Sequence, residues 1–303
     1  MGNTKIEWAE KTWNPVTGCS KISLGCNNCY AERMSKRLRG RCGYDADEPF
    51  KVALHPNRLE EPLRCSKPST IFVCSMGDLF HPEVPFAYIE RVFNIMLHAP
   101  QHTFLVLTKR PRTAKMFLDP NLRSDVFKHW PLPNVWLGVT AENQEMADER
   151  IPVLLQIPAA IRFVSVEPMI GQADIDSYLI VGADRLGSNM RKGIDWVICG
   201  GETGPKARPM HPDWARSLRD QCQTAGVPFF FKQHGEWEPF YDRDKDDPDW
   251  RNIPKESPSV CRMNLAGGHG FHGDRVVYFR KVGKKSAGRL LDGREWNEMP
   301  EVR

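Results

Sequence analysis

The feature that most constrains the fold is an alternation of short apolar runs with helix-like stretches between residues 70 and 235. Each run is apolar almost throughout, which is typical of a parallel strand buried on both faces. Between two of the runs, residues 85–98 carry apolar side chains at helical spacing. With a first strand expected near Thr12–Gly18, the pattern predicts about seven strand–helix units. The other six runs are Thr70–Cys74, Thr103–Thr108, Val135–Thr140, Ile161–Val166, Trp196–Cys199 and Pro228–Phe231.

This alternation predicts an α/β fold, a complete or partial (β/α) barrel of about six to eight parallel strands. A doubly wound open sheet is the alternative. The pattern stops after His234, so we predict a barrel over residues 1–235 and a C-terminal extension over residues 236–303 that packs on it. Barrels of this kind carry their reactive groups just after each strand. Polar or charged residues follow every run here, which predicts one polar site assembled from many strands.

The bulk properties narrow the class of protein. The 303 residues carry a formal net charge of +4, which permits a nucleic-acid partner without arguing for one. The first residues lack the apolar core of a signal peptide, and no run approaches the roughly 20 apolar residues of a membrane helix. Nine cysteines in such a chain favour metal ligation, catalysis or burial over disulfides. We therefore expect a cytoplasmic protein without a membrane partner.

Three cysteines lie close together on a loop rich in glycine and asparagine. They are Cys19, Cys26 and Cys29, and we expect a helix to begin near Tyr30. A Cys-x-x-Cys pair brings two sulfurs to one metal centre, and the third thiol is near enough to join them. Backbone N–H groups of such a loop can also bond to cluster sulfurs. The loop is therefore a candidate metal site.

The number of thiols decides which metal sites are open to this loop. Four thiolates would complete a zinc site or an electron-transfer cluster. Three thiolates on a four-iron cluster leave one iron open, and S-adenosylmethionine can take it through its amino and carboxylate groups. An electron from the cluster then breaks a carbon–sulfur bond and generates an adenosyl radical. The alternatives are structural zinc, with His81 or His55 as fourth ligand, and unligated thiols.

The cysteine triad followed by strand–helix units resembles the radical S-adenosylmethionine superfamily. The stretch from Ile71 to Pro111 is most similar to the branch that contains spore photoproduct lyase. Over nearly the full length, segments such as GCSKISLGCNNCYAERM, CGGETG and FFFKQHGEW look like the phage-associated three-cysteine proteins. Two features depart from the usual pattern. The first cysteine gap is six residues instead of three, and Asn28 stands where an aromatic residue usually precedes the third cysteine.

The resemblance implies two cofactors and a set of site residues. The cofactors are a [4Fe–4S] cluster on Cys19, Cys26 and Cys29, and S-adenosylmethionine. The implied activity is that of a radical enzyme, with a lyase or isomerase favoured. For the cofactor, the resemblance implies that the Gly77-Asp78 turn meets the methionine amino group. Lys109 and Thr140 reach its carboxylate or the ribose. Tyr30 stacks on adenine, with Trp13 as a competing candidate for that role. For the substrate, the implied catalytic residues are Glu142, Glu167 and Glu202.

Phage association suggests a modified base in DNA as the substrate and the host cytoplasm as the location. Such chemistry needs an electron donor, for example flavodoxin or ferredoxin.

Two alternative functions remain. One is a zinc-stabilised protein that binds nucleic acid or a partner without catalysis, and the other is a barrel that uses S-adenosylmethionine for methyl transfer without radicals. Candidate phosphate contacts are Arg33, Lys36, Arg37, Arg39 and Arg41 after the cysteines, and Arg280, Lys281, Lys284, Lys285 and Arg289 in the tail.

Overall fold

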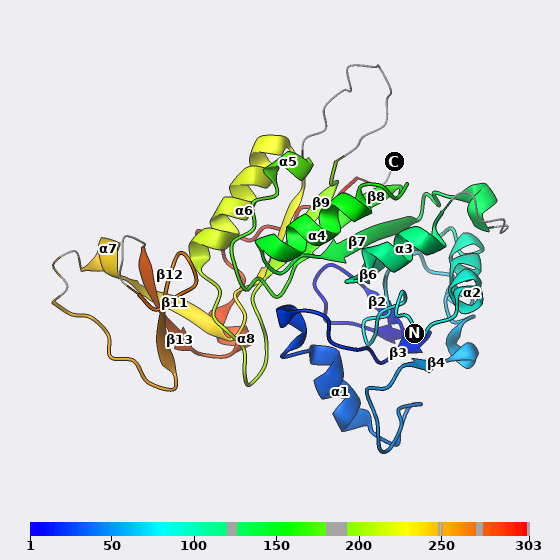
Figure 1. The fold of residues 1–303 in the computed structure, drawn as a ribbon, viewed down its shortest axis with the longest axis horizontal. Helices are drawn as coiled ribbons and strands as arrows, with labels where there is room; N and C mark the ends of the chain where they lie inside the picture. Colours follow the sequence, from blue (N-terminus) through cyan, green and yellow to red (C-terminus); the bar gives the residue numbers. More distant parts are fainter. Residues whose placement is uncertain (120–125, 180–192, 248, 250, 271–274, 302–303) are drawn as a thin grey trace. The chain divides into compact units, whose positions relative to one another are not determined.

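The structure is a computed structural model, and it describes residues 1–301 except 120–125, 180–192, 248, 250 and 271–274 (Figure 1). Its largest element is an eight-stranded sheet. In order across the sheet, the strands are β1 (Gly2–Asn3), β2 (Lys11–Trp13), β5 (Thr70–Val73), β6 (Thr103–Thr108), β7 (Val135–Thr140), β8 (Ile161–Val166), β9 (Trp196–Gly200) and β10 (Phe229–Gln233).

Parallel pairing dominates this sheet. Strands β2 and β5, β5 and β6, β6 and β7, and β9 and β10 pair in parallel, whereas β1 pairs with β2 in the antiparallel sense. The mixed α/β fold with a large, mainly parallel sheet is therefore confirmed. Strands β1 and β10 stand at the two ends of the strand order, and closure into a barrel stays a prediction. The runs at 103–108, 135–140 and 161–166 are strands with the predicted bounds.

The expectation of one first strand over Thr12–Gly18 is wrong. Strand β2 ends at Trp13, and the separate strand β3 (Val16–Thr17) pairs antiparallel with β4 (Ala53–Leu54). The break falls at Asn14-Pro15, because proline has no N–H to donate to a neighbouring strand. The Asn14 side chain instead accepts hydrogen bonds from the Met76 N–H at 3.0 Å and the Ser75 hydroxyl at 3.2 Å. The chain thus leaves the large sheet shortly before Cys19.

The chain divides into two compact units. The first contains residues 1–140 and 148–164, and the second contains residues 141–147 and 165–303. The predicted boundary between residues 235 and 236 stays a prediction. No helix among the described residues combines the length and the apolar character that crossing a bilayer requires. The longer helices are α1 (Tyr30–Leu38), α2 (Phe86–Leu97), α3 (Pro111–Phe117), α4 (Gln144–Leu154) and α6 (Pro212–Ala225).

Aromatic side chains fill part of the core of the first unit. The helix predicted over residues 85–98 is α2, with Pro85 as its N-cap. Its Phe93 ring lies 5.3 Å from the Phe117 ring of α3 and 6.3 Å from the Phe80 ring, measured between centroids, so α2 and α3 contact each other (Figure 1). All three side chains are buried. This packing holds the segment that follows β5 against the end of α3, the helix that begins directly after Lys109 and Arg110.

The second unit carries a further antiparallel sheet and the C-terminal tail. The sheet contains β11 (Trp237–Asp242), β13 (Val276–Lys281) and β12 (Val260–Asn264) in that order. The tail runs along β10, where the Phe231 N–H donates to the Trp296 carbonyl at 2.9 Å and the Glu298 N–H donates to the Phe229 carbonyl at 3.3 Å. The remaining short helices of the two units are η1 (Leu24–Cys26), η2 (Pro56–Arg58) and η3 (Val126–His129) in the first, and α5 (Asp176–Leu179), α7 (Arg243–Asp246) and α8 (Lys284–Ala287) in the second.

Gly18 lets the cysteine loop start against two neighbouring segments. Its φ is +82°, and a Cβ there would lie only 2.0 Å from the Lys51 carbonyl oxygen. Its N–H donates to the Met76 carbonyl at 2.9 Å, and Gly18 and Gly77 form a parallel bridge. A side chain at position 18 would therefore meet backbone that cannot move aside easily. The residue before Cys19 must be glycine for steric as well as conformational reasons.

We predict that Gly18→Ala destabilises the chain by about 2–4 kcal/mol, from backbone strain and the clash with Lys51 combined. The matched control is Gly226→Ala, at a position with φ of +66° where an added Cβ would meet nothing within 4 Å. That control should lose only about 1 kcal/mol, the cost of a left-handed conformation alone. Denaturant unfolding of both metal-free variants measures the difference, and equal losses would contradict the close approach.

Candidate functional site

The three cysteine thiols lie on one loop of the first unit and are free and half-buried. Cys19 directly follows Gly18, and its N–H donates to the Phe50 carbonyl at 3.2 Å. Cys26 ends the short helix η1, and Cys29 is the N-cap of α1. The Cys29 N–H donates to the Cys26 carbonyl at 3.3 Å. The Cys-x-x-Cys pair thus forms a tight turn at the start of α1, as the sequence predicted for the helix.

The surroundings of Cys26 favour a thiolate. Burial raises the pKa of this thiol, but the Lys109 ammonium and hydrogen bonds from the backbone of Ile22 and Ser23 lower it, and the net pKa falls below the usual value. The Ser23 hydroxyl also lies 3.7 Å from the Cys26 sulfur. These groups supply positive charge and N–H donors to the sulfur, which are the interactions that stabilise metal-bound thiolates.

Cys19 lies in a different environment. Burial and the nearby Asp78 carboxylate raise the pKa of this thiol to about 11, although Arg110 acts to lower it. The Arg110 Nη1 lies 3.4 Å from the Cys19 sulfur, and the Cys19 thiol itself lies 3.4 Å from the Ser20 carbonyl oxygen. Cys19 is therefore a protonated thiol in the metal-free protein, with a cationic hydrogen-bond donor already in contact with its sulfur.

The Asp78 carboxylate joins the ends of strands β5 and β6. It is buried, and each of its two oxygens accepts two hydrogen bonds. Oδ1 accepts from the Phe80 N–H at 3.0 Å and the Thr108 hydroxyl at 2.7 Å. Oδ2 accepts from the Lys109 N–H at 3.2 Å and the Arg110 Nη1 at 3.4 Å. Asp78 therefore organises the loop after β6, and its carboxylate is already occupied by protein donors.

The two histidines considered as zinc ligands are both hydrogen-bonded within the protein. His81 accepts the Glu83 N–H on Nδ1 at 3.2 Å and contacts the Ser20 hydroxyl through Nε2 at 2.8 Å. His55 contacts the Thr17 hydroxyl through Nε2 at 2.8 Å. Burial, assisted by Arg110, lowers the pKa of His81, and burial, assisted by Arg58, lowers the pKa of His55 to about 4. Both rings are therefore neutral and have structural partners.

The donor set of the loop can be compared with the needs of an iron–sulfur cluster. In the part of the chain that the structure describes, no three His, Cys, Asp or Glu side chains converge closely enough to form a metal-binding group. The donors nevertheless fit a cluster in number and chemistry, since three free thiols share one loop. Charged or N–H donors lie beside two of their sulfurs. Cys19, Cys26 and Cys29 are thus suitable ligands for a cluster with one open iron.

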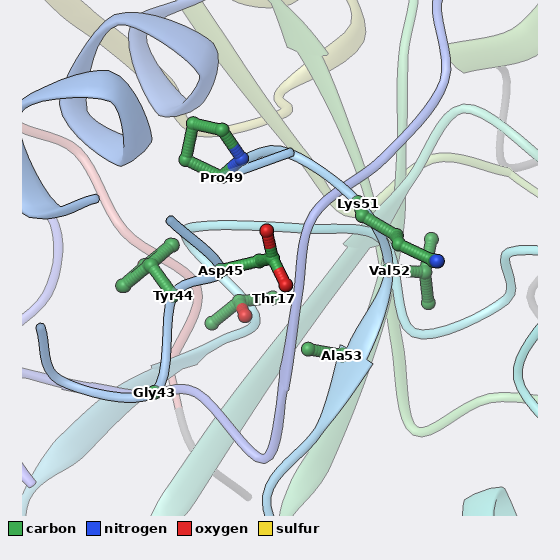
Figure 2. A pocket seen from close by; sticks show the side chains of 8 residues that line it. All are labelled: Thr17, Gly43, Tyr44, Asp45, Pro49, Lys51, Val52 and Ala53. Carbon is green, nitrogen blue, oxygen red and sulfur yellow. The ribbon is translucent and has the colours of Figure 1, made fainter. Parts of the chain in front are cut away.

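A cavity of about 350 Å³ lies beside the start of the cysteine loop (Figure 2). Thr17 lines it from the strand before Gly18, and the other lining residues come from the segment 43–53. In Figure 2, the Asp45 carboxylate points into the cavity. One of its oxygens accepts the N–H groups of Asp47 and Glu48 at 2.7 and 2.8 Å, which folds the segment into a turn. This segment supplies the Phe50 carbonyl that holds the Cys19 backbone.

The remaining predicted cofactor residues of the first unit differ in exposure. Tyr30 is 55% exposed at the start of α1 and is accessible to a ligand. Trp13 is fully buried, and its Nε1 donates to the Arg58 carbonyl at 2.8 Å, so it is a core residue and no candidate for adenine stacking. Thr140 is buried at the end of β7, where its carbonyl accepts from Arg150 at 2.9 Å. Lys109 is half-buried next to Cys26.

The three predicted catalytic glutamates lie in the second unit. Glu167 forms a half-buried ion pair with Lys232, with 2.7 Å between Oε1 and Nζ. Glu202 is buried and binds Arg208 through both oxygens, at 2.6 Å to Nη2 and 2.9 Å to Nε. Glu142 is fully buried, and its backbone carbonyl accepts the Ile170 N–H at 2.9 Å. Two of the three carboxylates are therefore paired with cations that the site prediction did not include.

Three cations pair with predicted site residues, although the sequence assigned them no partner. Arg110 and Lys232 lie among the polar residues at the ends of predicted strands, and this position marks them as candidates for the polar site. Arg208 follows the glycine-rich segment after β9 and had no such signal. The partners of Arg110 and Lys232 depend on how segments far apart in the chain meet, whereas Arg208 pairs with Glu202 in the same loop.

Comparisons with known proteins identify one family and several solved structures of low similarity. A family model described as "Protein of unknown function (DUF5131)" matches residues 3–300. The chain belongs to this family. No curated protein matches the sequence of this family member. Among solved structures, a cysteine-to-serine mutant of spore photoproduct lyase aligns with 94% of this chain and 71% of its own, at 11% identity and a TM-score of 0.45.

A double mutant of spore photoproduct lyase with bound AdoMet and dinucleoside spore photoproduct also aligns. It covers 92% of this chain and 71% of its own, at 11% identity and a TM-score of 0.45. The resemblance to that branch and the phage association both stay predictions.

We predict that iodoacetamide modifies Cys26 of the iron-free protein at least about tenfold faster than Cys19 near neutral pH. Only the thiolate reacts, and the pKa is lowered at Cys26 but raised to about 11 at Cys19. The advantage of Cys26 should therefore shrink as the pH rises toward that value. Replacing Lys109 by Gln should slow Cys26 and leave Cys19 unchanged. Mass spectrometry of the labelled peptides measures both rates, and equal rates would contradict this charge arrangement.

Proposed function

We propose that this protein is a radical S-adenosylmethionine enzyme in which Cys19, Cys26 and Cys29 hold a [4Fe–4S] cluster. The observation that carries the proposal is the arrangement of two successive cations beside two of the three thiols. Arg110 donates to the Cys19 sulfur, and the Lys109 ammonium acts on Cys26. Three soft donors with compensating positive charge suit a cluster whose fourth iron is left to another ligand.

The cluster, when bound, supplies the electron that cleaves a carbon–sulfur bond of S-adenosylmethionine to give a 5′-deoxyadenosyl radical. The chain's own residues bind and orient the cofactor. We assign the methionine amino group to the backbone of Gly77 and Asp78, since four protein donors already occupy the Asp78 carboxylate. Lys109 and Thr140 are assigned to the carboxylate and ribose. Exposed Tyr30 is assigned to the adenine ring.

The glutamates of the second unit are assigned to the substrate. Glu167 is the one best suited to a proton-transfer role, because it is half-buried and paired with Lys232. The Lys232 ammonium can stabilise the ionised carboxylate or donate a proton to it. Glu202 is held by Arg208 on both oxygens, which suits a positioning role. Glu142, which is fully buried, is assigned with them as the third substrate-side carboxylate.

The proposed substrate is a modified base in DNA, and the proposed electron donor is a flavodoxin or ferredoxin. Helix α1 begins directly after Cys29 and carries basic side chains that are exposed to solvent. Arg37 and Arg39 are exposed near its end, and such residues contact phosphates without reading sequence. A lyase or isomerase reaction on the base is favoured, and the protein acts in the cytoplasm, that of the host if a phage encodes it.

Anaerobic reconstitution tests the cluster. We predict a brown protein with about four irons and matching sulfide per chain. Replacing Cys19, Cys26 or Cys29 by Ala should each abolish iron binding and the release of 5′-deoxyadenosine. Cys65→Ala is the matched control, since Cys65 is a half-buried thiol that contacts the Lys67 carbonyl outside the loop.

Metal analysis of the same preparations separates the alternatives. A colourless protein with one tightly bound zinc would replace the proposal by a zinc-stabilised binding protein. Iron-loaded protein that converts S-adenosylmethionine only to a methylated product and S-adenosylhomocysteine would instead indicate methyl transfer.

DNA with a modified base tests the substrate. We predict that modified DNA increases 5′-deoxyadenosine release over that seen with unmodified DNA of the same sequence. Arg37→Gln should weaken DNA binding several-fold and reduce its dependence on salt, because fewer counterions are released. The control is Arg64→Gln, which removes an exposed arginine that pairs with Glu60. Equal release with both DNAs, together with unchanged binding by Arg37→Gln, would refute this substrate class.

A further inference from the structure

Arg110 is a buried arginine whose guanidinium contacts three groups of the first unit. Its side chain is only 8% exposed. Nη1 lies 3.4 Å from the Cys19 sulfur and 3.4 Å from Asp78 Oδ2. Nη2 donates to the Ser20 hydroxyl at 2.8 Å and to the Ser20 carbonyl at 3.1 Å. The guanidinium therefore bridges the cysteine loop and the Asp78 turn.

The backbone of Arg110 is held as firmly as its side chain. Its N–H donates to the Thr108 hydroxyl at 2.9 Å, and that hydroxyl donates to Asp78 Oδ1 at 2.7 Å. Pro111 follows directly and starts α3, so the residue is fixed between the end of β6 and a helix. A side chain held at both ends loses little further freedom when it binds a ligand. The donor that meets the Cys19 sulfur is therefore preorganised.

The charge around Arg110 leaves room for a second anion. A buried guanidinium needs compensating negative charge, and Asp78 supplies one carboxylate at a long 3.4 Å contact. The other three hydrogen bonds that Asp78 accepts come from neutral donors. Of the remaining groups that contact the guanidinium, the Ser20 groups are neutral, whereas the Cys19 sulfur becomes an anion when it ligates a metal. Metal binding at Cys19 would thus give Arg110 a second anionic partner.

We propose that Arg110 is a positioning residue of the cluster, which donates a hydrogen bond to the Cys19 thiolate and stabilises the reduced form. This inference rests on the proposed function and assigns a role to a residue outside the cofactor and substrate sets. Reduction adds one negative charge to the cluster, so a fixed cation bonded to one of its sulfurs favours the reduced state. Lys109 acts differently, because its ammonium affects Cys26 by charge.

Redox titration of the reconstituted protein, followed by the electron paramagnetic resonance signal of the reduced cluster, tests the role. With Arg110→Gln, we expect the ratio of reduced to oxidised cluster at a fixed potential to fall about tenfold, since charge and donor are both altered. Arg110→Lys keeps the charge and should give an intermediate ratio. The matched control is Arg112→Gln, which removes the same charge from an exposed side chain two residues on and should match the wild type.

The outcomes separate this inference from the proposed function. Fully loaded Arg110→Gln with the wild-type ratio would overturn the role of Arg110 while the cluster assignment stands. A wild-type protein that takes up zinc or no iron would overturn both. If Arg110→Gln folds, as judged by its melting temperature without metal, but fails to retain iron, the positioning role is supported. If it does not fold, Arg110→Lys decides: a loaded Arg110→Lys cluster with the wild-type ratio would overturn the role of the guanidinium donor.

Discussion

The Asp78 carboxylate is the constraint on which the candidate site depends. It is a buried negative charge that accepts four hydrogen bonds, three of them from residues 108–110 at the end of β6. A buried carboxylate left without such donors would be strongly destabilising, so these bonds fix the loop after β6 against the turn after β5. The same contacts place Lys109 and Arg110 in consecutive positions beside the cysteine loop. The positions of the two cations therefore follow from satisfying one buried anion.

The two cysteines that receive these cations are prepared for metal in different ways. At Cys26, the ammonium of Lys109 and backbone donors outweigh burial, and the pKa of the thiol is lowered. At Cys19, burial and Asp78 outweigh Arg110, and the pKa of the thiol is raised. Arg110, which also bonds to Asp78 and Ser20, lowers the pKa of Cys19 by less than burial and Asp78 raise it. Metal binding at Cys19 must therefore displace a proton from a thiol whose pKa is raised. At Cys26, whose pKa is lowered, removing the proton costs less free energy.

The sequence predicted those parts of the fold that depend on local pattern. The runs at 103–108, 135–140 and 161–166 are strands with the predicted bounds, because runs of buried apolar residues leave few other conformations. The first strand was wrong, because Asn14-Pro15 interrupts pairing and the Asn14 side chain binds another loop. The cysteine loop and the helix at Tyr30 were found from spacing.

The contacts of Arg110 and Lys232 could not be predicted, since they join residues 90 and 65 positions apart in the chain. A strand end marks such a residue as a candidate, but only the folded chain brings Ser20 to Arg110 or Glu167 to Lys232. Trp13 shows the converse case. Under the resemblance it was a competing candidate for adenine stacking, whereas the fold places it in the core with its Nε1 bonded to the Arg58 carbonyl.

The histidines near the loop show why a fourth protein ligand is disfavoured. His81 is neutral, and because its Nδ1 accepts the Glu83 N–H, its Nε2 carries the proton and donates to the Ser20 hydroxyl. That hydroxyl also accepts from Arg110, so His81 orients the group that holds the guanidinium against Cys19. Turning His81 into a zinc ligand would break this link and leave Ser20 unsupported. The ring is therefore better explained as part of the network around Arg110, which leaves three thiols as the donors of the loop.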